Sequence, residues 1–105
     1  MKEKFIKRAR ETFGYDTAKI GLLKLVQPYF DSVISEEKKA EIRKDDKQFS
    51  EGDLYVLAEY NPTMDSYSGA ACLVVITHIL RDIPQYGLKE GYAVWSFRFI
   101  GMIKI

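Results

Sequence analysis

The sequence has little of the chemistry that supports covalent or metal-dependent catalysis. It contains one cysteine, one histidine and one tryptophan among 105 residues. A single cysteine excludes an internal disulfide, and it leaves too few Cys and His ligands for a zinc site. Glycine-rich phosphate loops and Gly-x-Ser-x-Gly turns are also absent. We therefore expect no metal and no cofactor, and the sequence identifies no catalytic residue.

Long apolar runs are absent as well. No stretch approaches the roughly 18–20 consecutive apolar residues of a membrane-spanning helix, and the segment after Met1 is charged. These observations predict a cytoplasmic protein without a membrane partner. Because 47% of the 105 residues are hydrophobic, the chain suits a single core and one domain. The sequence does not determine the oligomeric state, and a monomer is favoured.

The charge is balanced overall but unevenly distributed. The net charge is +1, yet residues 1–24 carry seven Lys or Arg against three Asp or Glu. The remaining residues carry nine basic and twelve acidic side chains. A basic N-terminal segment thus precedes a mildly acidic body, which is compatible with an ordinary solvated helix face.

Hydrophobic spacing predicts two helices and five strands. Phe5, Ala9 and Phe13 recur at helical intervals within residues 2–13, and a shorter helix is predicted over 28–34. Strands are predicted at 19–26, 39–43, 54–60, 70–80 and 92–100, with a long turn-rich loop at 61–69. This pattern favours an α+β, mostly β, fold: a small five-stranded mixed β-barrel domain over 18–105, preceded by an N-terminal helical extension over 1–17.

Strand alternation predicts which side chains fill the shared interior of this barrel. The predicted members are Leu23, Leu25, Ile42, Val56, Val74, Ile76, Val94 and either Trp95 or Phe97. Cys72 lies in the apolar strand at 70–80 and is expected to be packing material. His78, in the same strand, is expected to be half-buried and hydrogen-bonded.

The most unusual segment covers residues 36–46. Nine of its eleven residues are charged, yet Ala40 and Ile42 are spaced as in a strand. An extended chain that points Ala40 and Ile42 toward the core points Glu41 and Arg43 the other way. We interpret the segment as the wall of a polar site. The alternative is a surface salt-bridge ladder worth less than about 1 kcal/mol per pair.

A larger set of residues resembles a known family. The set comprises Leu23-Lys24-Leu25, Pro28-Tyr29-Phe30, Val33, Lys38, Glu41-Ile42-Arg43-Lys44, Asp46, Phe49, Gly52-Asp53, Leu57, Glu59-Tyr60, Tyr67-Ser68-Gly69, Thr77, Gly87-Leu88 and Gly91-Tyr92. Over residues 20–98 the chain resembles the small bacterial and phage proteins grouped as domain of unknown function 3850. That group is similar to a branch of the ASCH superfamily, which implies a PUA-like β-barrel.

The superfamily signature is usually written GxKxxExR. Lys38, Glu41 and Arg43 occupy its charged positions, whereas Glu36 stands at the glycine position. Because a glycine there would permit a positive φ, we expect the turn into strand 39–43 to be built differently. Many relatives carry a histidine just before the first strand's Leu-Lys pair, and this chain has Gly21 there.

The resemblance implies an RNA or nucleotide-like ligand in a cleft between helix 28–34 and the barrel. Arg43 and Lys38 would hold phosphate, and Glu41 would accept a hydrogen bond from an exocyclic amine. Tyr60 and Tyr92 would offer stacking faces. The predicted ligand-binding residues are Lys24, Lys38, Glu41, Arg43, Lys44, Tyr60 and Tyr92.

Two other functions stay open at this stage. One is a small hydrolase or nuclease acting on modified nucleosides or RNA. Some ASCH proteins hydrolyse N-acetylated cytidine with a threonine three residues after the signature lysine; that position is Glu41 here, a poor nucleophile for acyl transfer. The other is a protein-interaction module, which an exposed Phe5, Ala9 and Phe13 stripe would favour and packing of the stripe on the barrel would not.

Overall fold

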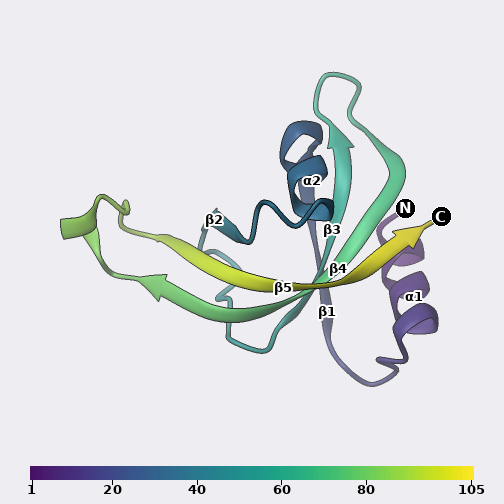
Figure 1. The fold of residues 1–105 in the computed structure, drawn as a ribbon, viewed down its shortest axis with the longest axis horizontal. Helices are drawn as coiled ribbons and strands as arrows, with labels where there is room; N and C mark the ends of the chain where they lie inside the picture. The colour runs from purple at the N-terminus through teal and green to yellow at the C-terminus, as the bar shows by residue number, and fades with distance from the viewer.

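Five strands form one mixed sheet that curls into a half-barrel (Figure 1). The structure is a computed structural model that describes all 105 residues. The sheet order is β1-β3-β4-β5-β2; β1 and β3 are parallel, and the other neighbours are antiparallel. In chain order the elements are α1 (Lys2–Phe13), β1 (Ile20–Val26), α2 (Gln27–Ile34), β2 (Ala40–Lys44), β3 (Leu54–Asn61), β4 (Ser66–Arg81), a 3₁₀ turn (Pro84–Tyr86) and β5 (Tyr92–Lys104).

The predicted α+β, mostly β, architecture with five strands and two helices is confirmed, but the sheet is not a closed barrel. The two edge strands, β1 and β2, form no ladder with each other. The 61–69 loop is also shorter than predicted, because Ser66 to Gly69 belong to β4. Asn61 makes this possible, since its side-chain oxygen accepts hydrogen bonds from the backbone N–H groups of Thr63 and Met64 and folds the chain into a tight hairpin.

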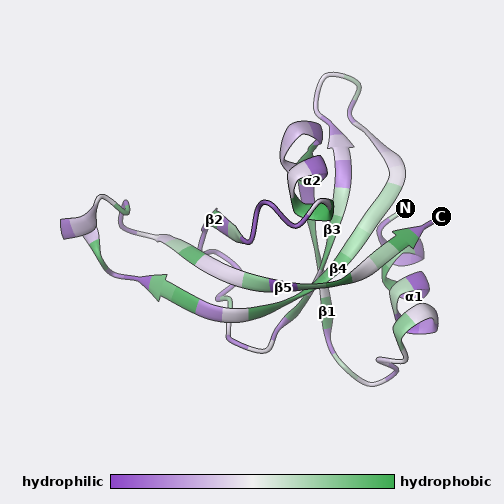
Figure 2. Cartoon of the chain, viewed as in Figure 1, coloured by the Kyte–Doolittle hydropathy of each residue, from purple (hydrophilic) through white to green (hydrophobic).

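The concave face of the sheet holds the larger apolar core. Helix α2 follows β1 directly, with Pro28 in its first turn, and it buries Phe30 and Val33 against this face. The cluster comprises Leu23, Leu25, Phe30, Val33, Phe49, Tyr55, Leu57, Cys72, Val74, Ile76, Ala93, Trp95 and Phe97. Figure 2 shows hydrophobic residues concentrated along the central strands and hydrophilic residues over the connection from α2 to β2.

The convex face carries a second core, beneath helix α1. Phe5 and Ala9 are fully buried against the sheet, and Phe13 lies against Gly101, where an added Cβ would stand 2.7 Å from the ring. The other members of this cluster are Ile20, Leu54, Val56, Ala58, Ala71, Leu73 and Ile103. The apolar stripe of α1 is therefore covered by its own sheet. That stripe is not available to a partner, so it gives no support to the interaction-module alternative.

Three predicted members of the barrel interior lie elsewhere. Ile42 is 66% exposed, and Val94, its cross-strand partner, is only partly buried on the same outer face. Val56 is fully buried, but it belongs to the core beneath α1. Because Val56 and Leu57 are adjacent in a strand, they point to opposite faces, and both faces of β3 are covered.

Cys72 and His78, both on β4, differ in environment. Cys72 is fully buried, as predicted, and burial raises the pKa of its thiol to about 12. His78 is exposed and not half-buried. The β4–β5 register shifts between Ile76 and His78, so the alternation that would have turned the imidazole inward is interrupted there.

The β4–β5 hairpin extends well beyond the body of the half-barrel (Figure 1). Its end carries the short 3₁₀ turn, where Tyr86 is 81% exposed. Neither helix of the chain is long and apolar enough to cross a membrane.

Candidate functional site

Strand β2 presents the side chains of Glu41 and Arg43 to the inside of the half-barrel. Glu41 is 4% exposed and Arg43 is partly buried, whereas Ala40 and Ile42 face solvent. This is the reverse of the predicted orientation. The reason lies in β5: Trp95 and Ala93 fill the interior, Glu41 pairs with Trp95 and Arg43 with Ala93, and residues paired across strands share a face.

The carboxylate of Glu41 is held between two cations. Lys38 Nζ lies 2.5 Å from Oε1, and Arg43 Nε donates to Oε2 at 2.8 Å. The side chains of Lys38 and Arg43 are 24% and 23% exposed. Charge-assisted hydrogen bonds at these distances are strong, and a carboxylate this buried requires them. The three signature residues therefore form a buried ion cluster rather than a surface ladder.

Arg43 also links the two edges of the sheet. Its terminal nitrogen donates to the backbone oxygen of Lys24 on β1 at 2.9 Å. We call the space between the facing edges of β1 and β2 the seam. It is closed at this point by a side chain and not by a backbone ladder. Because Glu41 fixes the guanidinium of Arg43, the ion cluster also sets the spacing of the seam.

The turn from α2 into β2 places Lys38 over the cluster. Glu36 has a φ of 63°, so it adopts the left-handed conformation that the signature glycine would allow. The expectation of a differently built turn is therefore wrong. The backbone N–H groups of Glu37 and Lys38 both donate to Ser32 O and hold the turn in place. Those bonds offset a conformation that costs a non-glycine residue about 1–2 kcal/mol.

A groove of about 530 Å³ lies between α2 and the seam. The cluster forms one wall, and Tyr29, which is 55% exposed, rises from α2 on the opposite side. The lining residues are Lys24, Leu25, Val26, Tyr29, Lys38, Glu41, Ile42 and Arg43. The groove thus combines cations, a buried carboxylate and an exposed aromatic ring.

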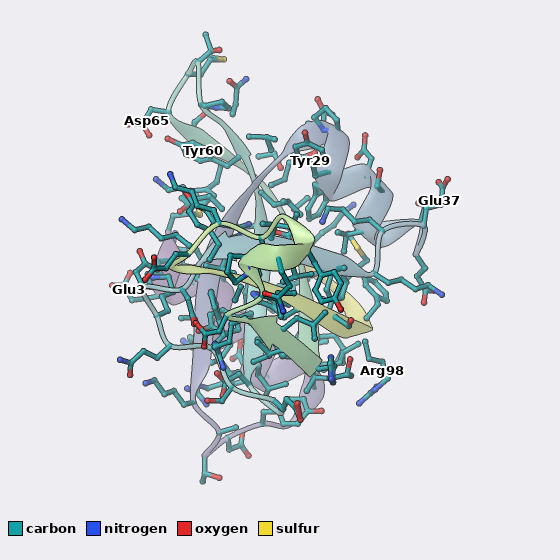
Figure 3. All side chains as sticks on the ribbon, turned by 90° about the vertical axis from the view of Figure 1, so that its left-hand side faces the viewer. Glu3, Tyr29, Glu37, Tyr60, Asp65 and Arg98 are labelled. Carbon is teal, nitrogen blue, oxygen red and sulfur yellow. The ribbon has the colours of Figure 1, made fainter.

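Lys24 and Tyr60 stand between this groove and a second hollow. The ammonium of Lys24 lies 4.4 Å from the centre of the Tyr60 ring, a favourable cation–π contact. Tyr60 donates its hydroxyl to Asp65, and this hydrogen bond raises the pKa of the phenol. Figure 3 shows Tyr60 next to Asp65 on the β3–β4 hairpin, with Tyr29 on the neighbouring helix α2. The second hollow, of about 600 Å³, begins at Val26 and includes Tyr60.

Two predicted ligand-binding residues lie away from the groove. Lys44 and Tyr92 are cross-strand partners, one residue out of phase with Arg43 and Ala93, so they face the convex side. Lys89 approaches the ring of Tyr92 at 5.8 Å. The structure therefore brings Lys24, Lys38, Glu41 and Arg43 to one groove, with Tyr60 outside it in contact with Lys24, and it leaves Lys44 and Tyr92 apart.

Gly21, where many relatives carry histidine, is tightly surrounded. A Cβ at this position would lie 2.4 Å from a ring carbon of Tyr55. The Tyr55 ring therefore occupies the space that a side chain at position 21 would need. Burial, together with the nearby Asp53, Asp45 and Asp46 carboxylates, raises the pKa of Tyr55.

No group of three or more His, Cys, Asp or Glu side chains is arranged so that it could hold a metal ion. Residues missed by sequence reasoning are Tyr29 in the groove and Lys2 and Lys47 in a neighbouring hollow. Tyr29 carried a usable signal, because it follows the helix-starting Pro28. The excess of cations in residues 1–24 was the only signal for Lys2, and Lys47 gave none.

Comparison with known proteins places the chain in one family. No curated protein matches the chain. A protein family does: its match begins at β1, contains α2, the ion cluster and the groove, and ends within β5. The chain belongs to the family described as Domain of unknown function (DUF3850), which matches residues 20–97.

Proposed function

We propose that this protein binds RNA or a nucleotide-like ligand in the groove between α2 and the seam, as a PUA-like domain of the ASCH type. The main support is the position of the signature residues: Lys38, Glu41 and Arg43 converge on the wall of one groove. Lys24 adds a further positive charge, and it pairs with no carboxylate. Cations beside an aromatic ring suit a ligand that has both phosphate and base.

The cluster assigns a different task to each residue. Both oxygens of Glu41 are already bonded to cations, so its main role is to hold Lys38 and Arg43 in place. Lys24 and the exposed parts of Lys38 and Arg43 then contact phosphate, and Tyr29 stacks on a base. Glu41 as a reader of an exocyclic amine is less well supported than the sequence suggested, since the residue is only 4% exposed.

Catalysis gains no support from the geometry. A general base must reach the proton that it removes, and Glu41 is buried between two cations. We therefore expect no deacetylation of N-acetylcytidine. Purified protein incubated with this nucleoside and followed by chromatography provides the measurement, and efficient turnover would replace the binding proposal with the hydrolase.

Binding is tested best by titration with a direct readout. Trp95 is the only tryptophan and is paired with Glu41 across the sheet, so its fluorescence reports on binding at the site. Changes in backbone amide NMR shifts show which residues the ligand contacts. The probes are a short single-stranded RNA, uridine and cytidine monophosphates, and N-acetylcytidine. We expect shifts at residues 24–29 and 38–43 with the phosphate-bearing probes.

Lys24→Ala is the informative variant, because Lys24 is exposed and takes no part in the ion cluster. It should weaken binding of the RNA and reduce the dependence of affinity on salt by about 0.7 on a log–log plot. Lys39→Ala is the matched control, since Lys39 is exposed on the neighbouring turn and does not line the groove. Equal affinities for the parent, Lys24→Ala and Lys39→Ala would contradict the proposal.

A further inference from the structure

The free edge of β1 is followed by a row of four separate hollows. One hollow of about 220 Å³ contains Lys19 and Gly21, and the next, of about 330 Å³, runs from Leu22 to Lys24. The groove and the second hollow continue the row beyond Val26. Each neighbouring pair shares at least one lining residue. We call this row the edge channel.

The middle of the edge channel is strongly cationic. The hollow between Leu22 and Lys24 is lined by Lys2, Lys24, Arg43 and Lys47 and by no acidic residue. Of these, only Arg43 forms an ion pair. The three lysines come from α1, β1 and the loop after β2, so three separate segments direct unpaired charge to one place. Such a concentration favours an anion and attracts a polyanion most.

The length of the channel exceeds that of a single nucleotide. Seven residues of β1 extend about 20 Å, and the channel continues past the strand at both ends. Aromatic rings accompany it: Tyr67 lines the cationic hollow, Tyr29 the groove, and Tyr60 the hollow beyond. Alternating cations and aromatic rings along a groove are typical of sites for single-stranded nucleic acid, which span about 4–16 nucleotides in comparable small barrels.

A free strand edge can also recruit a peptide as an additional strand, but this channel does not favour it. Arg43 already occupies the backbone oxygen of Lys24, which an added strand would need for its ladder. The guanidinium also spans the seam at that point. The unpaired lysines further favour a ligand with several negative charges, which a phosphate backbone supplies.

From these observations, and building on the nucleotide-binding proposal above, we propose that the ligand is a single-stranded oligonucleotide lying along the edge channel. Its phosphates contact Lys24, Lys47 and Lys2, and one base enters the groove beside Tyr29. Helix α1, which precedes the family-matched residues 20–97, contributes Lys2 to this site. Affinity should therefore depend on the number of nucleotides and not only on the identity of one.

The test compares oligouridylates of one, two, four and eight nucleotides on the full chain. Affinity should rise at least tenfold from one to four nucleotides, with a plateau once the channel is filled. A double variant, Lys2→Ala with Lys47→Ala, should weaken binding of the eight-nucleotide RNA about tenfold and lower its log–log salt slope by about 0.7 per cation removed. The same variant should leave the affinity for the mononucleotide within twofold, because neither residue lines the groove.

The matched control is Lys7→Ala with Lys39→Ala, which removes two exposed lysines that do not line the channel. Thermal denaturation confirms that both double variants are folded. Mononucleotide binding without any gain from added nucleotides would overturn the oligonucleotide proposal alone, as would equal losses in both variants. Failure of every RNA to bind would overturn it together with the proposed function. Equally strong competition by polyglutamate of matched charge would show a general polyanion site and reject an RNA channel.

Discussion

Replacement of Glu41 by glutamine tests the ion cluster directly. Glu41→Gln keeps the size of the side chain but removes the charge that Lys38 Nζ and Arg43 Nε approach at 2.5 and 2.8 Å. Loss of one partner from a fully buried ion pair costs about 3–5 kcal/mol. Lys38 and Arg43 retain about a quarter of their exposure, so water compensates in part, and we expect a loss of about 2–3 kcal/mol in the free energy of unfolding.

A loss of this size is large for a domain whose total stability is of the order of 5–15 kcal/mol. It should lower the melting temperature by about 10–15 °C, measured by circular dichroism. Glu51→Gln, at an exposed turn position without an ion pair, is the control and should melt close to the parent. If Arg43→Gln is added to Glu41→Gln, part of the loss should be recovered, because the guanidinium no longer lacks its partner. A melting temperature within about 1 °C of the parent for Glu41→Gln would show that the cluster is a weak surface ladder after all.

The remaining predictions concern the backbone and the buried thiol. Glu36→Gly should raise the free energy of unfolding by about 0.5–1 kcal/mol, because glycine adopts the φ of 63° without strain. A lower free energy of unfolding, measured by urea denaturation, would contradict this. Gly21→Ala should lower it by about 1–3 kcal/mol, since the new Cβ would stand 2.4 Å from the Tyr55 ring, and an unchanged urea midpoint would rule that out. The pKa of Cys72 rises from 9.0 to about 12 on burial, so the folded state holds its proton more tightly than the unfolded state. That contribution to stability is complete below pH 9 and is lost as the pH rises toward 12, by up to about 1.4 kcal/mol per pH unit. If the free energy of unfolding of a Cys72→Ala variant falls with pH above 9 as steeply as that of the parent, the buried thiol makes no such contribution.

The sequence predicted the order of the elements well, because periodicity is a local property. Phe5 and Ala9 are spaced for a helix, and the strand at 54–60 is too apolar to be anything but buried. The predicted barrel was closed, however, and the structure is an open half-barrel. Closure depends on pairing between β1 and β2, which are distant in sequence, and no local pattern reports whether that pairing forms.

The candidate site was predicted in composition but not in orientation. Alternation correctly separated Glu41 from Ile42, yet it could not tell which of the two faces inward. The rule that apolar side chains face the core predicted that Ile42 points inward. In the structure Glu41 points inward instead, because it pairs with Trp95 on β5. Lys24 was placed near the cluster on the expectation that the first strand neighbours strand 39–43, but β1 and β2 are the two edges of the sheet and Arg43 makes the contact by donating to the backbone oxygen of Lys24. Lys44 has the parity of Ile42, and Tyr92 is its cross-strand partner, so alternation places both on the face opposite Glu41 and Arg43.

Part of the apolar packing of the sheet lies away from the ion cluster, in the core beneath α1. The groove and the ion cluster belong to the concave face, while Phe5, Ala9 and Ile103 stabilise the convex face without approaching either. Distant substitutions combine additively, and a protein tolerates changes at its site only while its total stability stays above the threshold for folding. Substitutions at the groove can therefore change ligand preference and lower stability without unfolding the protein, because the core beneath α1 is left intact.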